Sequence, residues 1–147
     1  MEIVYSIRDY TPSDYPELIA VWEKIGLGAA HRGDVPEVID RTLKMGGRLL
    51  LLINKSNNEI MGTSWLTIDG RRTYLHHFGI AEKYQGMGLS KPLLEASLAI
   101  VKAIGLQVKL EVHQSNLKAA NLYKKYGFTY LGDYDVYIIR DLLSVIL

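Results

Sequence analysis

The stretch Tyr84-Gln85-Gly86-Met87-Gly88-Leu89-Ser90 says more about the fold of this chain than any other. It follows an apolar run, Tyr74 to Ile80, that predicts a β-strand, and it precedes Lys91 to Ile104, whose apolar stripe predicts a helix. A glycine-rich turn from strand to helix leaves backbone N–H groups unpaired at the helix N-terminus, where the helix dipole also favours negative charge. The stretch therefore predicts a loop that can bind a phosphate.

The loop does not match either of two common phosphate-binding patterns. A P-loop requires G-x-x-x-x-G-K-[ST], whereas Lys91 here follows Ser90 in the reverse order. The dinucleotide fingerprint requires a third glycine at the position that Lys91 occupies. One alternative remains open at this point, namely a turn in which Gly86 and Gly88 only supply a positive φ.

Composition narrows the class of protein. The 147 residues fit one domain, and 48% hydrophobic and 22% charged residues are ordinary for a soluble globular protein. A formal charge of +1 argues against a nucleic-acid or membrane-surface partner, which would need a basic field. The chain has no cysteine, which excludes disulfides and thiolate nucleophiles. No apolar run reaches the ~18 residues of a membrane span, and the start lacks a signal-peptide layout, so we expect a cytoplasmic protein.

The pattern of apolar, turn and capping residues predicts the remaining elements. We expect strands at Ile3–Arg8, Arg48–Asn54, Ile60–Asp69, Thr73–Ile80, Leu106–His113, Thr129–Leu131 and Tyr134–Asp141. We expect helices from about Asp14 to Ile25, from a cap at Asp34 to Gly46, from Lys91 to Ile104 and from Asn116 to Tyr126. Mixed order with helices between some strands predicts an α/β sandwich with a mixed sheet, as a single domain over residues 1–147.

Two blocks of sequence resemble the GNAT superfamily of N-acetyltransferases. Gln85 to Ser90 is similar to the family's R/Q-x-x-G-x-G/A pyrophosphate loop, with serine where the family usually has glycine or alanine. Leu110 to Asn116, followed by Ala119, Leu122-Tyr123 and Gly127-Phe128, resembles the family's L-x-V-x-x-x-N-x-x-A-x-x-L-Y-x-x-x-G-F stretch. The Leu-Glu-Val start of the second block is most similar to the group that acetylates protein N-terminal amines, such as the ribosomal-protein-alanine acetyltransferases.

The resemblance implies the three-layer α-β-α fold of the acyl-CoA N-acyltransferases, with a sheet that splays at its centre and acetyl-CoA as the co-substrate. The implied coenzyme contacts are the loop amides of Gln85, Gly86, Met87, Gly88, Leu89 and Ser90 for the pyrophosphate, the backbone of Phe78 and Ile80 for the pantetheine arm, and Asn116 and Tyr123. Asn116 is also expected to cap the helix that follows it. Proteins of this shape often form homodimers, although no segment of this sequence specifies one.

The implied reaction is the attack of a neutral amine on a thioester, which needs one group to accept a proton and another to protonate the thiolate. Tyr123 stands at the tyrosine that donates to the coenzyme sulfur in the family, and a phenol has a reference pKa near ~10. Glu111 is the expected base, acting through water. His76 and His77 remain alternative bases, and because they are adjacent on one strand we expect them to point to opposite faces.

The acceptor amine is left open between a protein or peptide N-terminus and a small molecule. Acceptor contacts are expected from the first helix pair, from the loop between these helices and from the last hairpin. No metal is expected, because the spacing of His113 and Glu111 does not support a metal site. The alternatives are a non-catalytic acyl-CoA-binding regulatory module and a nucleotide-binding regulatory domain that uses only the glycine loop.

Overall fold

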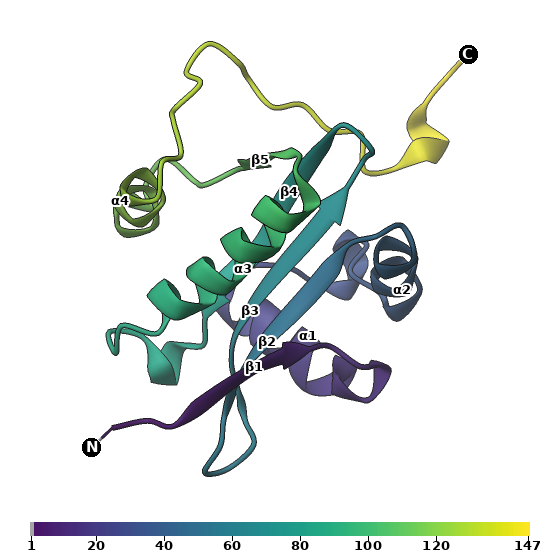
Figure 1. Cartoon of the computed structure of the whole chain (residues 1–147). Coiled ribbons are helices and arrows are strands. Elements are labelled where there is room, and N and C mark those ends of the chain that lie inside the picture. The colour runs from purple at the N-terminus through teal and green to yellow at the C-terminus, as the bar shows by residue number, and fades with distance from the viewer. Residues whose placement is uncertain (1) are drawn as a thin grey trace. The chain divides into compact units, whose positions relative to one another are not determined.

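The computed structural model describes residues 2–147, which form two units, with Glu111 the last residue of the first and Val112 the first of the second. The first unit holds one five-stranded sheet in the order β1-β2-β3-β4-β5, flanked by helices (Figure 1). Its strands are β1 (Tyr5–Asp9), β2 (Arg48–Asn54), β3 (Ile60–Ile68), β4 (Arg72–Ile80) and β5 (Gln107–Leu110). Its helices are η1 (Pro12–Asp14), α1 (Tyr15–Ile25), η2 (Ala30–Arg32), α2 (Pro36–Lys44), η3 (Glu82–Tyr84) and α3 (Ser90–Ile104).

The sheet is mixed, as the sequence predicts. The strands β1 to β4 pair antiparallel in sequence order, and β5 pairs parallel with β4 after the crossover through α3. The five consecutive aliphatic residues Leu49 to Ile53 are at most 3% exposed, which agrees with the prediction that this strand is buried on both faces.

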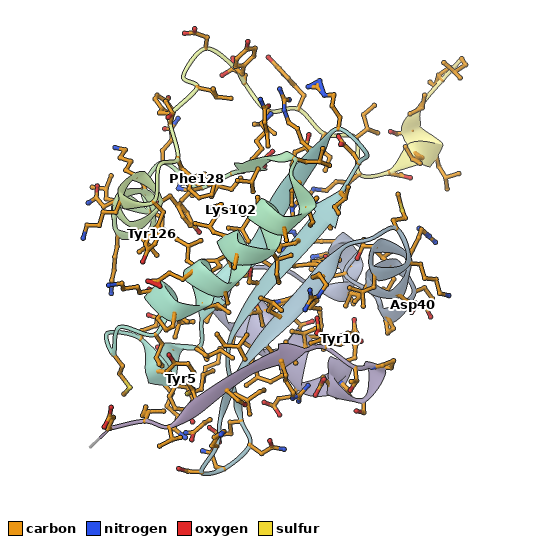
Figure 2. The ribbon with its side chains drawn as sticks, in the orientation of Figure 1. Tyr5, Tyr10, Asp40, Lys102, Tyr126 and Phe128 are labelled. Atoms are coloured by element: carbon orange, nitrogen blue, oxygen red, sulfur yellow. The ribbon has the colours of Figure 1, made fainter. Side chains whose placement is uncertain are left out.

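Alternate residues of β2 supply two hydrophobic cores, one on each face of the sheet. One core combines Leu49 and Leu51 with residues of α1 and α2, and it includes Tyr10, labelled in Figure 2. The other core combines Leu50 and Leu52 with residues of α3. Helix α3 therefore covers one face and the α1–α2 pair covers the other, which gives the expected α-β-α layering (Figure 1).

The second unit contains α4 (Leu117–Lys125) and η4 (Leu142–Ser144). The prediction of a final hairpin from Thr129–Leu131 and Tyr134–Asp141 is wrong, because residues 129–141 form no strand. Neighbouring apolar side chains in this segment, such as Tyr137 and Ile138, are both exposed, by 89% and 69%, so no buried face forms on which a hairpin could pack. No helix among residues 2–147 is both long and apolar enough to cross a membrane.

Two predicted boundaries also move for identifiable reasons. Strand β5 ends at Leu110 and not at His113, so Glu111 and His113 both lie beyond the end of the strand. Helix α2 is capped by Val35 and not by Asp34, because the Asp34 carboxylate is used elsewhere in the fold.

Candidate active site

The glycine loop lies between the end of β4 and the start of α3. Gly86 and Gly88 have φ values of 78° and 74°, in the left-handed region that favours glycine. A Cβ built on either glycine would meet no atom within 4 Å, so the loop borders open space. Ser90 is the first residue of α3, which brings the unpaired amides of a helix N-terminus to the end of the loop. This arrangement can receive an anionic group.

The loop is anchored on its N-terminal side by Tyr84, which is only 4% exposed. Its hydroxyl donates to the Glu59 carboxylate and accepts from the amides of Asn54 and Asn57, each at 3.2 Å. The hydrogen bond from Tyr84 is the main cause of the lowered pKa of Glu59. These bonds tie the segment that enters the loop to the turn between β2 and β3, so the loop starts from a fixed point.

The edge of β4 that leads to the loop has no strand partner among residues 2–147. Pairing with β5 stops at Leu75, whereas β4 continues to Ile80, as the implied splay of the sheet requires. Phe78 and Ile80 lie on the part of β4 beyond its pairing with β5, and their side chains pack against the α3-side core. The side chain of Gln85 folds back and donates to the Ile80 carbonyl at 2.9 Å, which connects the loop to the strand end.

A β-bulge interrupts β4 at its two histidines. Between the pairs Thr63–Gly79 and Trp65–His76, β4 has one residue more than β3. His77 takes a φ of 44°, which is unusual for a residue with a side chain. The prediction that His76 and His77 point to opposite faces is wrong, because both rings pack against Trp65, with centroids 6.2 and 5.2 Å away. The extra residue cancels the normal alternation.

His76 remains open to solvent at the surface of the sheet. Its Nε2 lies 2.8 Å from the Thr67 hydroxyl, and its ring stacks on Tyr74 at 5.8 Å. Desolvation by the surrounding protein, and then the charge of His77, lower the pKa of His76 below its usual value. His76 is therefore a neutral imidazole at pH 7.

His77 is paired with Asp34, from the loop between α1 and α2. The His77 Nε2 lies 3.0 Å from the Asp34 Oδ2, which also accepts from the Ala29 amide at 3.0 Å. Burial opposes ionisation of Asp34, but the hydrogen bond from His77, the charge that His77 carries when protonated and the Ala29 amide together outweigh burial and lower the pKa of Asp34. From the sequence, Asp34 is predicted only to cap a helix, since no local pattern links it to a histidine 43 positions away.

The second unit contains the other two predicted coenzyme residues. The Asn116 Oδ1 accepts from the Ala119 amide at 3.2 Å, which confirms the predicted N-cap of α4. Tyr123 is 7% exposed and packs edge-on against Phe128, labelled in Figure 2, with ring centroids 5.5 Å apart. Burial raises the pKa of Tyr123 to about 12, so its phenol stays protonated at neutral pH.

Glu111 is exposed and directly follows β5. His113 lies beyond the strand, where its Nδ1 is 2.8 Å from the Ser115 hydroxyl. Among the described residues, no group of three His, Cys, Asp or Glu side chains is placed to hold a metal ion.

Known proteins are similar to this chain in sequence and in fold. The model of the acetyltransferase (GNAT) family matches residues 7–128. A spermine/spermidine N(1)-acetyltransferase of Bacillus subtilis (strain 168) is 33% identical over 66 residues, a match that covers 44% of this chain and 43% of that protein. The chain thus spans less than half the length of this curated relative.

Two solved structures share the fold. An acetyltransferase of the GNAT family from Staphylococcus aureus Mu50 has a TM-score of 0.72 at 23% identity, over 84% of this chain and 82% of that one. The ribosomal-protein-S18-alanine N-acetyltransferase from Escherichia coli has a TM-score of 0.68 at 19% identity, over 86% of this chain and 78% of that one. Because the family model covers most of the chain, and with it both blocks that the resemblance rests on, the chain belongs to the acetyltransferase (GNAT) family.

Proposed function

We propose that this protein transfers an acetyl group from acetyl-CoA to a primary amine. The observation that carries the proposal is the succession of two features in a chain of this family. The end of β4 extends beyond its pairing with β5, and after η3 it is followed by the open glycine loop at the N-terminus of α3. An edge strand can hydrogen-bond a peptide-like arm, and the loop can bind a phosphate. The pantetheine and pyrophosphate of coenzyme A are joined in the same order.

The proposal assigns the coenzyme contacts as follows. The amides from Gln85 to Ser90 bind the pyrophosphate, with Gly86 and Gly88 supplying the left-handed turns. The backbone of Phe78 and Ile80 binds the pantetheine arm. In the second unit, Asn116 and Tyr123 contact the coenzyme by analogy with the family.

The proposed chemistry is direct attack in a ternary complex, since acetyl transfer from a thioester to an amine needs no covalent enzyme intermediate and the chain has no cysteine that could form a cysteinyl one. Tyr123 is the proposed acid that protonates the departing thiolate, and its raised pKa supports this role by keeping the phenol protonated. Glu111 is the proposed base, and its exposure fits a proton transfer through water. His76, whose lowered pKa favours the neutral imidazole, is the alternative base. The variant that loses more activity, Glu111→Gln or His76→Gln, would identify which of the two residues is the base.

The acceptor belongs to one of two classes of primary amine. The Leu-Glu-Val block favours a protein or peptide N-terminus. The relative that is 33% identical over 66 residues is named for polyamines and supports a small amine. If the acceptor is a protein N-terminus, peptides with a free N-terminus should be acetylated. If it is a small amine, spermidine should be acetylated instead.

The test measures coenzyme binding and turnover separately. Acetyl-CoA should raise the Tm of the purified protein, since a ligand that binds only the native state stabilises it. Free thiol should then appear on addition of spermidine or of peptides with a free N-terminus. Binding without turnover of any amine would favour the non-catalytic acyl-CoA module, and preferential binding of ATP or NAD would favour the nucleotide-binding alternative. Failure of acetyl-CoA to bind would refute the proposal.

A further inference from the structure

The pairing of Asp34 with His77 is a polar contact that the surrounding residues of the first unit enclose closely. Both side chains are shielded from water, with exposures of 12% and 18%. A Cβ added to Gly28 would stand 2.3 Å from the Asp34 Oδ2 and 2.5 Å from the His77 Nε2. The glycine at this position, unlike Gly86 or Gly88, is therefore required by space and not by its φ. The loop between α1 and α2 is packed directly onto the histidine.

The backbone of His77 is held in its unusual conformation by other elements. The Thr63 hydroxyl donates to the His77 carbonyl at 2.6 Å and accepts from the Trp22 indole at 2.9 Å. The Trp22 ring also packs edge-on against the imidazole at 4.5 Å. A left-handed residue with a side chain is strained and persists only where its surroundings impose it, most often at functional sites.

The pair determines which ring nitrogen of His77 carries the proton. An ionised Asp34 can only accept, so the Nε2 must donate to it, and the lone pair of the neutral ring is then on Nδ1. No group among residues 2–147 makes a hydrogen bond to this Nδ1. The charged and titratable groups nearby are Asp34 across the loop, His76 on the same strand, and Arg32, whose charge acts on Asp34.

We propose that the His77 Nδ1 accepts the first proton of the incoming ammonium group and that Asp34 is the positioning residue that holds His77 for this step. The inference rests on the proposed acetyl transfer and adds a step to it. A primary amine arrives as an ammonium ion and cannot attack until it loses a proton. Transfer to Nδ1 yields a neutral amine and an imidazolium whose Nε2–H remains bound to the Asp34 carboxylate.

The remaining steps balance with the roles proposed above. The amine nitrogen attacks the thioester carbonyl, the C–N bond forms and the C–S bond breaks. The second nitrogen proton passes through water to Glu111, while the coenzyme sulfur takes a proton from Tyr123. Glu111 returns its proton through solvent to Tyr123, and His77 releases one proton to solvent. The net products are the amide, coenzyme A and one proton.

The test is the pH profile of kcat/KM for His77→Asn and Asp34→Asn with the best acceptor amine of the wild type. Asparagine tolerates the left-handed backbone, so His77→Asn removes the imidazole with little cost in folding. At pH 7 we expect losses of about 100-fold for His77→Asn and about 10-fold for Asp34→Asn, within the range of general base catalysis. Both deficits should shrink as the pH approaches the amine's own pKa, because the amine then arrives neutral.

Asp14→Asn is the matched control, since it neutralises a comparably shielded carboxylate that pairs with Arg8 instead. Its pH profile should match that of the wild type. A second readout is independent of turnover: nitrogen NMR of the wild type should show the proton of the neutral His77 ring on Nε2, and Asp34→Asn should weaken that preference.

Three results would count against the inference. A loss that stays constant across pH would show that His77 is only structural. An Nδ1–H ring in the wild type would exclude the assigned proton acceptor. If the wild type acetylates no amine although it binds acetyl-CoA, the proposed function fails and this step fails with it, whereas a constant loss in an active enzyme overturns this inference alone.

Discussion

At the scale of single residues, the environment of a side chain decides what it can do chemically. Tyr123 and Tyr137 are the same residue type in the same unit, yet one is 7% exposed and the other 89%. Burial raises the pKa of Tyr123 to about 12. The family motif singled out Tyr123 among ten tyrosines, but the sequence contained no signal for its degree of burial.

Replacing Tyr123 by phenylalanine should lower kcat by about 100-fold, because it removes the proposed proton donor and little volume. The Kd for coenzyme A, measured by calorimetry, should change by less than about threefold. Tyr137→Phe is the matched control and should leave kcat unchanged. An equal loss in kcat and in coenzyme affinity would mean that Tyr123 has a structural role.

The ionised Asp14 carboxylate should stabilise the fold at neutral pH, and this contribution should be lost in acid. The hydrogen bond from Arg8, which outweighs the opposing effect of burial, lowers the pKa of Asp14 to about 2. A depressed pKa stabilises the fold above the unfolded value, and this stability is lost as the pH falls from about 4 towards 2. Urea unfolding of Asp14→Asn at pH 7 should show a loss of about 1 kcal/mol, with a smaller difference from wild type at pH 2.5. Asp40→Asn, which removes an exposed pair with Lys44, should cost less, and a pH-independent loss at Asp14 would contradict this account.

At the scale of elements, the sequence predicts strands and helices well where burial repeats with a regular period. The strand Arg48–Asn54 is confirmed at both ends, and the helix predicted from Lys91 to Ile104 starts one residue earlier. The period fails at the β4 bulge, because one inserted residue changes the face of every side chain after it. The prediction also fails at residues 129–141, where two short runs on either side of Gly132-Asp133 suggested a hairpin that does not form.

The Gly88→Ala substitution tests the glycine loop against a matched position on the same helix. Gly88 before α3 and Gly105 after it have φ values of 74° and 82°, and a Cβ on either would meet no atom within 4 Å. Each Gly→Ala variant should therefore lose about 1 kcal/mol of stability from the same backbone strain. Only Gly88→Ala should weaken acetyl-CoA binding, by about 10-fold in Kd, because it disturbs the amides that bind the pyrophosphate. If Gly88→Ala and Gly105→Ala bind acetyl-CoA with equal affinity, the pyrophosphate does not bind at this loop.

At the scale of the whole molecule, the order of the predicted strands and helices indicates an α/β sandwich, and the two cores on β2 account for it. The hydrophobic pattern determines the layers because it determines which side chains are buried. The layering does not depend on which individual residues these side chains contact. Long-range polar pairs are different. The hydrogen bond between Asp34 and His77 depends on where a loop closes over the sheet, and no local pattern records that.

The two units should respond differently to the same leucine truncation. Leu51 is fully buried in the core under α1 and α2, so Leu51→Ala should destabilise the protein by about 3 kcal/mol through lost transfer energy and a cavity. Leu143, in the second unit, is 94% exposed, so Leu143→Ala should change the free energy of unfolding by less than about 0.5 kcal/mol. Urea unfolding followed by circular dichroism would measure both. A large loss at Leu143 would mean that this side chain is covered in solution.

The short length of β5 has a consequence for handling the protein as well as for catalysis. Beyond Leu75, the side of β4 that faces away from β3 pairs with no strand of residues 2–147, and such an edge is a template for a strand from another molecule. If the coenzyme occupies this edge, it also shields it. Preparations stripped of acetyl-CoA should therefore associate more readily on storage than preparations kept saturated with it, which light scattering of the two would show.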